Sequence, residues 1–427
     1  MTELTFSNLT IEGWRQFKKV SIVLHPRLTV LTGANGAGKS TLLGVFSQHF
    51  GWHKNLLATP VKKRDGSKGF FSGFLTLFKK PSETPLPDNR DRIGVLKYSD
   101  GQVSQIFIPR ETGIEYGLEI NSQQHISGVN IPSHRVMSRF QQIGNIPTTD
   151  IGPEQAYGNY FSEIMGRYNG HQTQFSPVYR MKESLISMAT FGEGNKYVES
   201  KPELLRAYLG FIDALRLMLP ESLGFQDLSI RTPDVILVTK TGEFLIDAVS
   251  GGLSSILDLT WQIYMFSLKH VNPVVVMDEP ENHLHPSMQR TLMSKLLRTF
   301  PRAQFIVATH SPFIVTSEED CNIYALRYDL NDYGQGSSEP AFAPANSVVS
   351  VKLDMKDKAG NANDVLVEVL GLETTLPEWA EKKIRDIVTR LQGVGMSPEA
   401  YREISEDLKR SGLGKALPRV LSETLGK

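Results

Sequence analysis

The sequence has one cysteine, no long apolar run and no excess of either charge. Cys321 alone cannot form an internal disulfide framework or a cysteine-based zinc site. No run of 18 apolar residues occurs, and the first residues lack a basic segment followed by an apolar one. We therefore expect a cytoplasmic protein with neither a signal peptide nor a membrane partner.

The charge balance argues against a nucleic-acid-binding surface that spans the whole molecule. Lysine plus arginine and aspartate plus glutamate each number 46, which leaves no net field to attract a polyanion. A local basic stretch alternates with phenylalanines, at Lys62, Lys63, Arg64, Lys68, Lys79 and Lys80. This stretch is either a solvated insertion loop or a contact surface for nucleic acid or a partner protein.

Apolar patterning predicts an α/β fold with a parallel or mixed sheet. Strand-like segments at 274–277 and 305–308 enclose a helix-like segment at 287–299, and this alternation is typical of a parallel sheet covered by helices. We expect a head over residues 1–330. It contains an N-terminal β subdomain, an insertion at about 55–130 and a helical region at about 150–220.

The last part of the chain changes character. Residues 331–361 read as a linker, and 362–427 as a C-terminal helical appendage. Thr375 and Glu378 form a capping-box signature, and Ile384, Ile387 and Leu391 lie on one helical stripe behind it. We interpret this appendage as a docking module rather than a catalytic one.

A glycine-rich segment between a predicted strand and a predicted helix carries the strongest chemical signal. It fits GxxxxGK[ST] at every position, and its residues are Gly33, Ala34, Asn35, Gly36, Ala37, Gly38, Lys39, Ser40 and Thr41. Such a loop turns backbone N–H groups toward phosphate oxygens, with a lysine bridging the β- and γ-phosphates and a serine hydroxyl on Mg²⁺. The segment predicts ATP and Mg²⁺ as cofactors.

Two further polar clusters follow buried strands. Asp278 and Glu279 come directly after four apolar residues, at the strand end where open α/β sheets bind ligands. Asp278 is expected to hold Mg²⁺ and Glu279 to polarise the attacking water. His310 follows the strand 305–308, and a neutral imidazole there can contact the γ-phosphate and the water. Glu279 and His310 are thus the predicted catalytic pair.

The segment Ser250-Gly251-Gly252 lies between a predicted strand and a predicted helix. A serine and two glycine amides at a helix N-terminus form an anion site similar in kind to the phosphate loop. Together with Asp278-Glu279-Pro280-Glu281-Asn282-His283-Leu284-His285-Pro286 and Ile131-Pro132-Ser133-His134-Arg135, it resembles the ATP-binding-cassette (ABC) ATPases of the overcoming-lysogenization-defect type. DNA-repair and SMC-like heads are similar more distantly.

The resemblance has consequences for assembly and partners. It implies that Ser250 completes the ATP site of a second subunit in trans, so we expect a homodimer or a higher homo-oligomer. Members of this family often carry a Toprim nuclease domain, and residues 331–427 lack its acidic pattern. The chain therefore resembles the ATPase subunit of two-gene anti-phage systems of the Septu or PARIS type. Such a subunit implies a separate effector, an HNH or Toprim nuclease, and a phage trigger or DNA as a further partner.

Two other functions compete with this interpretation. A DNA-repair or SMC-like ATPase acting on DNA fits the same motifs. A transporter subunit fits less well, because Lys39 and Ser250 lie much farther apart than such a subunit needs.

Several residue roles stay open. Gln141 and Gln142 are alternatives for a Mg²⁺-sensing glutamine, and Trp14 or Phe17 either stacks on adenine or packs in the first hairpin. His283 and His285 belong either to a loop that faces the partner subunit or to a metal site.

Overall fold

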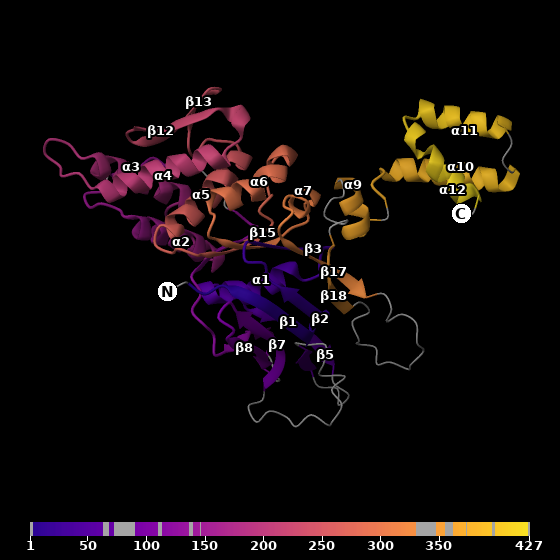
Figure 1. Cartoon of the computed structure of the whole chain (residues 1–427), viewed down its shortest axis with the longest axis horizontal. Helices are drawn as coiled ribbons and strands as arrows, with labels where there is room; N and C mark the ends of the chain where they lie inside the picture. The colour runs from indigo at the N-terminus through magenta and orange to yellow at the C-terminus, as the bar shows by residue number, and fades with distance from the viewer. Residues whose placement is uncertain are drawn as a thin grey trace. The chain divides into compact units, whose positions relative to one another are not determined.

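The computed structural model divides the chain into two units, residues 1–371 and 372–427. It describes residues 3–62, 68–71, 90–109, 113–135, 140–145, 147–329, 347–354, 362–372, 374–394 and 398–425. The larger unit is an α/β structure built on one mixed sheet, which confirms the predicted fold class (Figure 1).

The described strands of the main sheet number eleven, in the order β10-β8-β7-β1-β2-β18-β17-β3-β16-β15-β11. Their bounds are β1 Phe6–Trp14, β2 Phe17–Val23, β3 Leu28–Gly33, β7 Arg90–Tyr98, β8 Val103–Pro109, β10 Glu119–Asn121, β11 Gly128–Ile131, β15 Val274–Asp278, β16 Gln304–Ala308, β17 Asn322–Asp329 and β18 Ser347–Lys352. Within this order, the five adjacent strands β17, β3, β16, β15 and β11 run parallel to one another.

The parallel strands are buried on both faces. In β15, Val275 and Met277 enter one core cluster while Val274 and Val276 enter the other. Strand β16 alternates in the same way. This double burial explains the continuous apolar run in the sequence. The predicted adjacency of the strands before Asp278 and His310 is confirmed, because β15 pairs with β16.

The antiparallel strands correct one expectation. Strands β7, β8 and β10 fall within the predicted insertion, yet they extend the main sheet through pairs such as Leu9↔Leu96. Their buried residues complete the core beneath β1 and β2. Two short ribbons complete this region, β4 Leu56–Leu57 with β9 Glu115–Tyr116 and β5 Thr59–Lys62 with β6 Lys68–Phe71. Four basic residues of the stretch noted above, Lys63, Arg64, Lys79 and Lys80, lie outside the described residues.

Helices cover both faces of the parallel strands. Figure 1 shows α1 on the side of the antiparallel strands, and α2 to α6 with the ribbon β12–β14 on the other side. The bounds are α1 Lys39–Ser47, η1 Gln48–Phe50, α2 Pro153–Tyr168, α3 Pro177–Glu193, α4 Pro202–Met218, η3 Glu221–Leu223, β12 Phe225–Arg231, β13 Asp234–Thr239, β14 Gly242–Leu245, α5 Gly251–Ser267, α6 Pro286–Thr299 and α7 Pro312–Val315. No helix in the described parts of the chain is long and apolar enough to span a bilayer.

The larger unit ends later than the predicted boundary at residue 361. Helix α9 Ala362–Asp364 and the π-helical turn η5 Val365–Val369 belong to it, because Val365 and Val369 are buried in its main core. The smaller unit contains α10 Glu378–Val394, α11 Pro398–Arg410, η6 Gly414–Ala416 and α12 Leu417–Leu425. Ala380, Ile384 and Ile387 form its own core with Leu408 and Val420. The side chain of Leu391 lies outside the described set.

The position of this boundary predicts how C-terminal truncation affects the stability of the larger unit. A chain ending at residue 371 should keep the denaturation midpoint of the larger unit, since no core residue is lost. A chain ending at residue 360 should lose roughly 3 kcal/mol of unfolding free energy, because it removes the buried Val365 and Val369. Chemical denaturation of both proteins measures the difference. Equal midpoints would show that 362–371 is not part of the core.

Candidate functional site

The phosphate loop runs from the end of β3 to the start of α1. Gly38 adopts φ +96°, a left-handed conformation that favours glycine, and a Cβ there would clash with the Phe17 ring. A Cβ at Gly33 would clash with the carbonyl oxygen of Leu326. The backbone thus needs glycine at both positions to turn tightly at the N-terminus of α1. Such a terminus favours negative charge.

Lys39 lies inside this loop, with 6% of its surface exposed. Its ammonium donates to the carbonyl oxygens of Gly33 at 3.0 Å and Ala34 at 3.2 Å. The same Nζ lies 2.7 Å from Nε2 of His310. Burial lowers the pKa of His310, and the neighbouring Lys39 charge lowers it further. The imidazole is therefore neutral at neutral pH and accepts from Lys39 through Nε2.

Asp278 ends β15 beside the start of α1. Burial raises the pKa of its carboxyl group, and a hydrogen bond with Ser40 partly offsets that effect. Its Oδ1 is buried and has no hydrogen-bond partner among the described residues. A free carboxylate oxygen next to a serine hydroxyl fits Mg²⁺, which prefers oxygen ligands from one or two protein groups. Ser40 and Asp278 are the residues that could hold the ion.

Glu279 is held in a strained conformation at the edge of this site. Its φ is +47°, a left-handed value that costs a non-glycine residue about 1–3 kcal/mol. Its N–H donates to Ala308 O at 2.8 Å. One carboxylate oxygen accepts from Asn282 Nδ2 at 3.1 Å, and the other lies 3.8 Å from His310 Nε2. The Glu279 carboxylate and the His310 imidazole thus lie beside the phosphate loop, as the sequence predicts.

Glu281 anchors the loop that carries His310, a role that the sequence analysis missed. Its Oε1 accepts from Thr309 Oγ1 and from the backbone N–H groups of His310 and Ser311, the latter two at 3.2 Å. Burial raises the pKa of Glu281. In the sequence, Glu281 is visible only as an acidic residue two positions after Glu279. Nothing in that position indicates a contact with residues 309–311.

The predicted anion-binding segment Ser250-Gly251-Gly252, called here the signature segment, lies at the N-terminus of α5. Ser250 is the N-cap residue, but its hydroxyl makes no capping hydrogen bond, contrary to the capping role that a serine at this position suggests. Ser250 and Gly251 are exposed, and Gly252 packs against the D-loop, defined here as Asn282, His283 and Leu284. No hydrogen bond in the described structure joins residues 250–252 to residues 33–41 of the same chain.

The structure decides one of the open roles and shows the surroundings of the others. Trp14 and Phe17 are fully buried in the core, so the packing alternative is right and neither ring is available to adenine. The side chain of Gln141 bonds the Gln174 carbonyl and the Ser176 N–H in the helical region, and Gln142 is exposed. His285 caps α6 by accepting from Ser287 N–H.

A further segment ends beside Asp278 and Glu279. Strand β11 pairs in parallel with β15, with Ile131 opposite Met277. The next residues, from Pro132 to Arg135, therefore emerge next to Asp278 and Glu279. Sequence patterning cannot reveal this neighbour, because the pairing joins segments that lie far apart along the chain.

Comparisons with known proteins agree with the ATPase interpretation. The family described as "AAA domain, putative AbiEii toxin, Type IV TA system" matches residues 211–316, and the family "AAA domain" matches residues 8–71. "Retron Ec83 probable ATPase" from Escherichia coli is 34% identical over 27% of this chain and 23% of its own length. Septu protein PtuA from Bacillus thuringiensis is 25% identical over 38% of this chain and 42% of its own.

The matched region makes up a larger part of this chain than of some relatives. A second Septu PtuA, from Bacillus mycoides, is 21% identical over 70% of this chain and 36% of its own length. The chain therefore spans well under two thirds of the curated relatives it matches. The SMC head domain from Thermotoga maritima superposes over 83% of this chain and 98% of that chain, with 13% identity and a TM-score of 0.40. The two PtuA proteins and the retron ATPase confirm the resemblance to the Septu type of ATPase.

The arrangement of the site predicts that different substitutions affect ATP binding and ATP hydrolysis. Lys39→Ala should weaken ATP binding roughly 10–100-fold, because a charge-assisted contact to the phosphates is lost. Glu279→Gln should keep the affinity and lower kcat about 100-fold or more, because only the carboxylate that activates water is removed. Fluorescent-nucleotide titration and phosphate release measure the two effects. Hydrolysis by Glu279→Gln at the parent rate would exclude Glu279 as the base.

Proposed function

We propose that this chain is the ATP-hydrolysing subunit of an anti-phage defence complex. The observation that carries the proposal is the meeting of Lys39, Asp278, Glu279 and His310 at one sheet edge. A cation for the phosphates, an oxygen pair for Mg²⁺ and a carboxylate beside a neutral imidazole are the groups that phosphoryl transfer to water requires. The Septu and retron relatives support the defence context.

Each residue has a separate task in the proposed reaction. Lys39 and the N-terminus of α1 bind the phosphates, and Ser40 and Asp278 would hold Mg²⁺, which would neutralise charge on the phosphate oxygens. Glu279 orients the attacking water and takes its proton. When Lys39 turns to the phosphates, His310 contacts the γ-phosphate as a donor, in the tautomer that carries its proton on Nε2. The hydrogen bonds from residues 309–311 to Glu281 fix the position of the His310 imidazole relative to the phosphate loop.

The complete ATP site is proposed to form between two subunits. Ser250 and Gly251 are exposed at an N-terminus whose dipole favours anions, and the Ser250 hydroxyl is free of any capping bond. The D-loop packs directly under this N-terminus, so a partner that contacts one also meets the other. We infer that ATP–Mg²⁺ is sandwiched between the phosphate loop of one copy and Ser250 of the other, in a homodimer or a higher assembly.

The effector is proposed to be a separate nuclease, of the HNH or Toprim class, that the ATP state holds or releases. The smaller unit, residues 372–427, is the proposed docking module. Trp379 on α10 is 58% exposed and Tyr401 on α11 is 43% exposed, and large aromatic side chains often anchor protein interfaces. A phage component or DNA would then act as the trigger. Co-purification with the products of adjacent genes, followed by a phage challenge, tests this assignment against action on DNA alone.

The two-subunit site makes a complementation prediction. Ser250→Arg should leave the fold intact, since the side chain is exposed, but should abolish hydrolysis by blocking the partner's γ-phosphate. Mixing Ser250→Arg with Lys39→Ala protein should restore part of the activity, because each mixed dimer keeps one complete site. Phosphate release from the mixture measures it. A monomer with the full parent rate would contradict the shared site.

A further inference from the structure

Arg135 lies at the junction of three elements near the ATP site. It follows β11, which pairs with β15 and so ends beside Glu279. The same short loop is tied to Glu279 through Asn282, whose Nδ2 donates to Ser133 O at 3.2 Å and to Glu279 Oε2 at 3.1 Å. Arg135 itself donates from Nη2 to the carbonyl oxygen of Glu279 at 3.4 Å. The loop therefore contacts the backbone of the proposed base directly and its carboxylate through Asn282.

The other two nitrogens of the Arg135 side chain are enclosed by the surrounding protein. Its Nε and Nη1 are inaccessible and make no hydrogen bond within the described residues. Burial lowers the pKa of Arg135, while the charges of Asp258 and Glu281 raise it. Because an arginine stays protonated in proteins, Arg135 is a largely enclosed cation with two carboxylates nearby, of which Glu281 is buried and Asp258 partly buried. Glu281 Oε2, like these two nitrogens, lacks a hydrogen-bond partner in the described structure.

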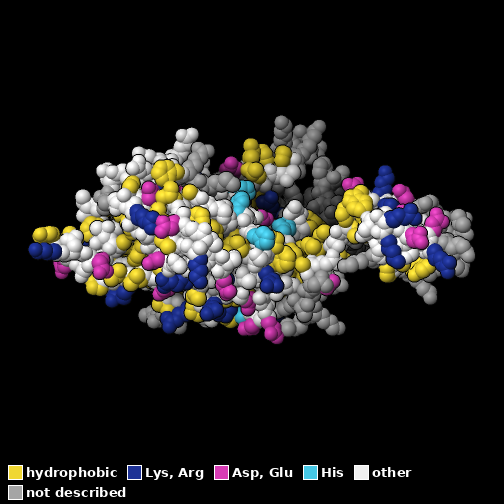
Figure 2. Space-filling model, turned by 90° about the horizontal axis from the view of Figure 1, so that it is seen from above, with side chains coloured by type: hydrophobic (Ala, Val, Ile, Leu, Met, Phe, Trp, Pro, Cys, Tyr) yellow, Lys and Arg dark blue, Asp and Glu magenta, His cyan; other side chains and the backbone are white. Residues whose placement is uncertain are grey.

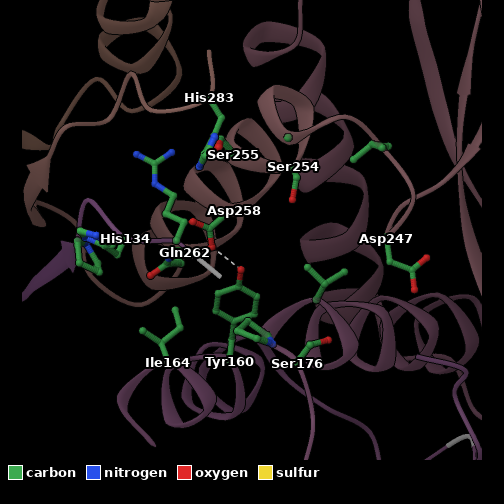
Figure 3. Close-up of a pocket in the computed structure, with 16 residues that line it drawn as sticks. His134, Tyr160, Ile164, Ser176, Asp247, Ser254, Ser255, Asp258, Gln262 and His283 are labelled. Carbon is green, nitrogen blue, oxygen red and sulfur yellow. Dashed lines mark hydrogen bonds between the residues drawn. The ribbon is translucent and has the colours of Figure 1, made fainter. Parts of the chain in front are cut away.

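Asp258 brings the signature helix into this cluster. It lies on α5, two turns after Gly251, and its Oδ1 accepts from Tyr160 Oη and, at 2.9 Å, from Gln262 Nε2. Figure 3 shows the hydrogen bond from Tyr160 to Asp258 among the side chains that line a pocket. Arg135 lines this cavity of about 190 Å³ together with Gly251 and His283. The cluster therefore spans from the catalytic loop to the start of α5.

This arrangement is a poor way to gain stability. A buried charge with unsatisfied donors costs several kcal/mol that hydrophobic packing would avoid. The same arrangement is well suited to positioning, since the direct contact of Arg135 is the backbone of a strained residue, Glu279 at φ +47°. Its charge partners lie on the two elements that must be in place for hydrolysis, the His310 anchor Glu281 and the helix α5.

We propose that Arg135 is a positioning residue for ATP hydrolysis that couples the placement of α5 to the geometry of Glu279. The inference rests on the proposed ATPase function and extends it. Within one subunit, the helix that offers Ser250 to the partner's ATP is linked through Asp258 and Arg135 to the base of the subunit's own site. Hydrolysis at one site then depends on how α5 is seated at the other.

The test is steady-state hydrolysis by Arg135→Met in the full chain, beside nucleotide titration. The substitution keeps the length of the side chain and removes its charge and donors, so kcat should fall about 10-fold or more while the Kd for ATP stays within about twofold. Arg135→Lys, which keeps the charge, should recover part of kcat. Arg180→Met is the matched control. Arg180 pairs with Glu163 and Glu183 in the helical region, so its loss should leave kcat unchanged.

A second variant covers the case in which Arg135→Met fails to fold. Asp258→Asn keeps the shape and the acceptor for Tyr160 but removes the charge that faces Arg135, and it should lower kcat with unchanged ATP affinity. A folded Arg135→Met or Asp258→Asn protein with the parent kcat overturns the coupling and leaves the ATPase proposal intact. A parent protein that does not hydrolyse ATP overturns the proposed function and this inference with it.

Discussion

The hydrogen-bonded register of β3, β16 and β15 is the constraint on which the ATP site depends. Leu31 pairs with Ala308, and Ala308 pairs with Asp278, so the phosphate loop, the His310 loop and the acidic pair leave the sheet at one edge. Both faces of these strands are buried, and a slip by one residue would move every side chain to the opposite core cluster. Apolar packing far from the nucleotide therefore sets the distances between the polar groups.

Charge compensation is the second organising feature of the site. The three carboxylates at the strand ends, Asp278, Glu279 and Glu281, all raise the pKa of Lys39 against the lowering effect of its burial. Glu281 and Asp258 likewise raise the pKa of Arg135 against the lowering effect of its burial. Each cation thus interacts with more than one acid: those near Lys39 lie on the segment 278–281, and Arg135 joins this segment to helix α5. The loss of one charge consequently disturbs more than one element, as expected for a buried polar network.

Local motifs explain which parts of the site could be predicted from sequence. A buried strand directly precedes the phosphate loop, the pair Asp278 and Glu279, and His310. The carboxyl ends of parallel strands meet at one edge of a sheet, so the sequence order alone predicts that these groups lie close together. Glu281, Asn282 and Arg135 act through tertiary contacts between loops, and no periodicity or spacing reports such contacts.

The misread parts of the fold have similar causes. The alternating pattern of β7 and β8 fits an independent hairpin as well as an extension of the main sheet, and only the pairing with β1 decides between them. The later boundary arises because the short apolar turn at 365–369 reads like the start of the helices that follow.

The position of β3 in the sheet also bears on synthesis of the protein. This apolar strand is flanked by β16 and β17, which follow it by roughly 270 residues, and ribosomes add about 5–20 residues per second. On the order of tens of seconds therefore pass between the appearance of β3 and that of its neighbours. During that interval its hydrogen-bonding edges are open to wrong partners, and such non-local pairing is slow in itself. The nascent chain consequently has the strongest need for chaperone protection before its nucleotide site can close.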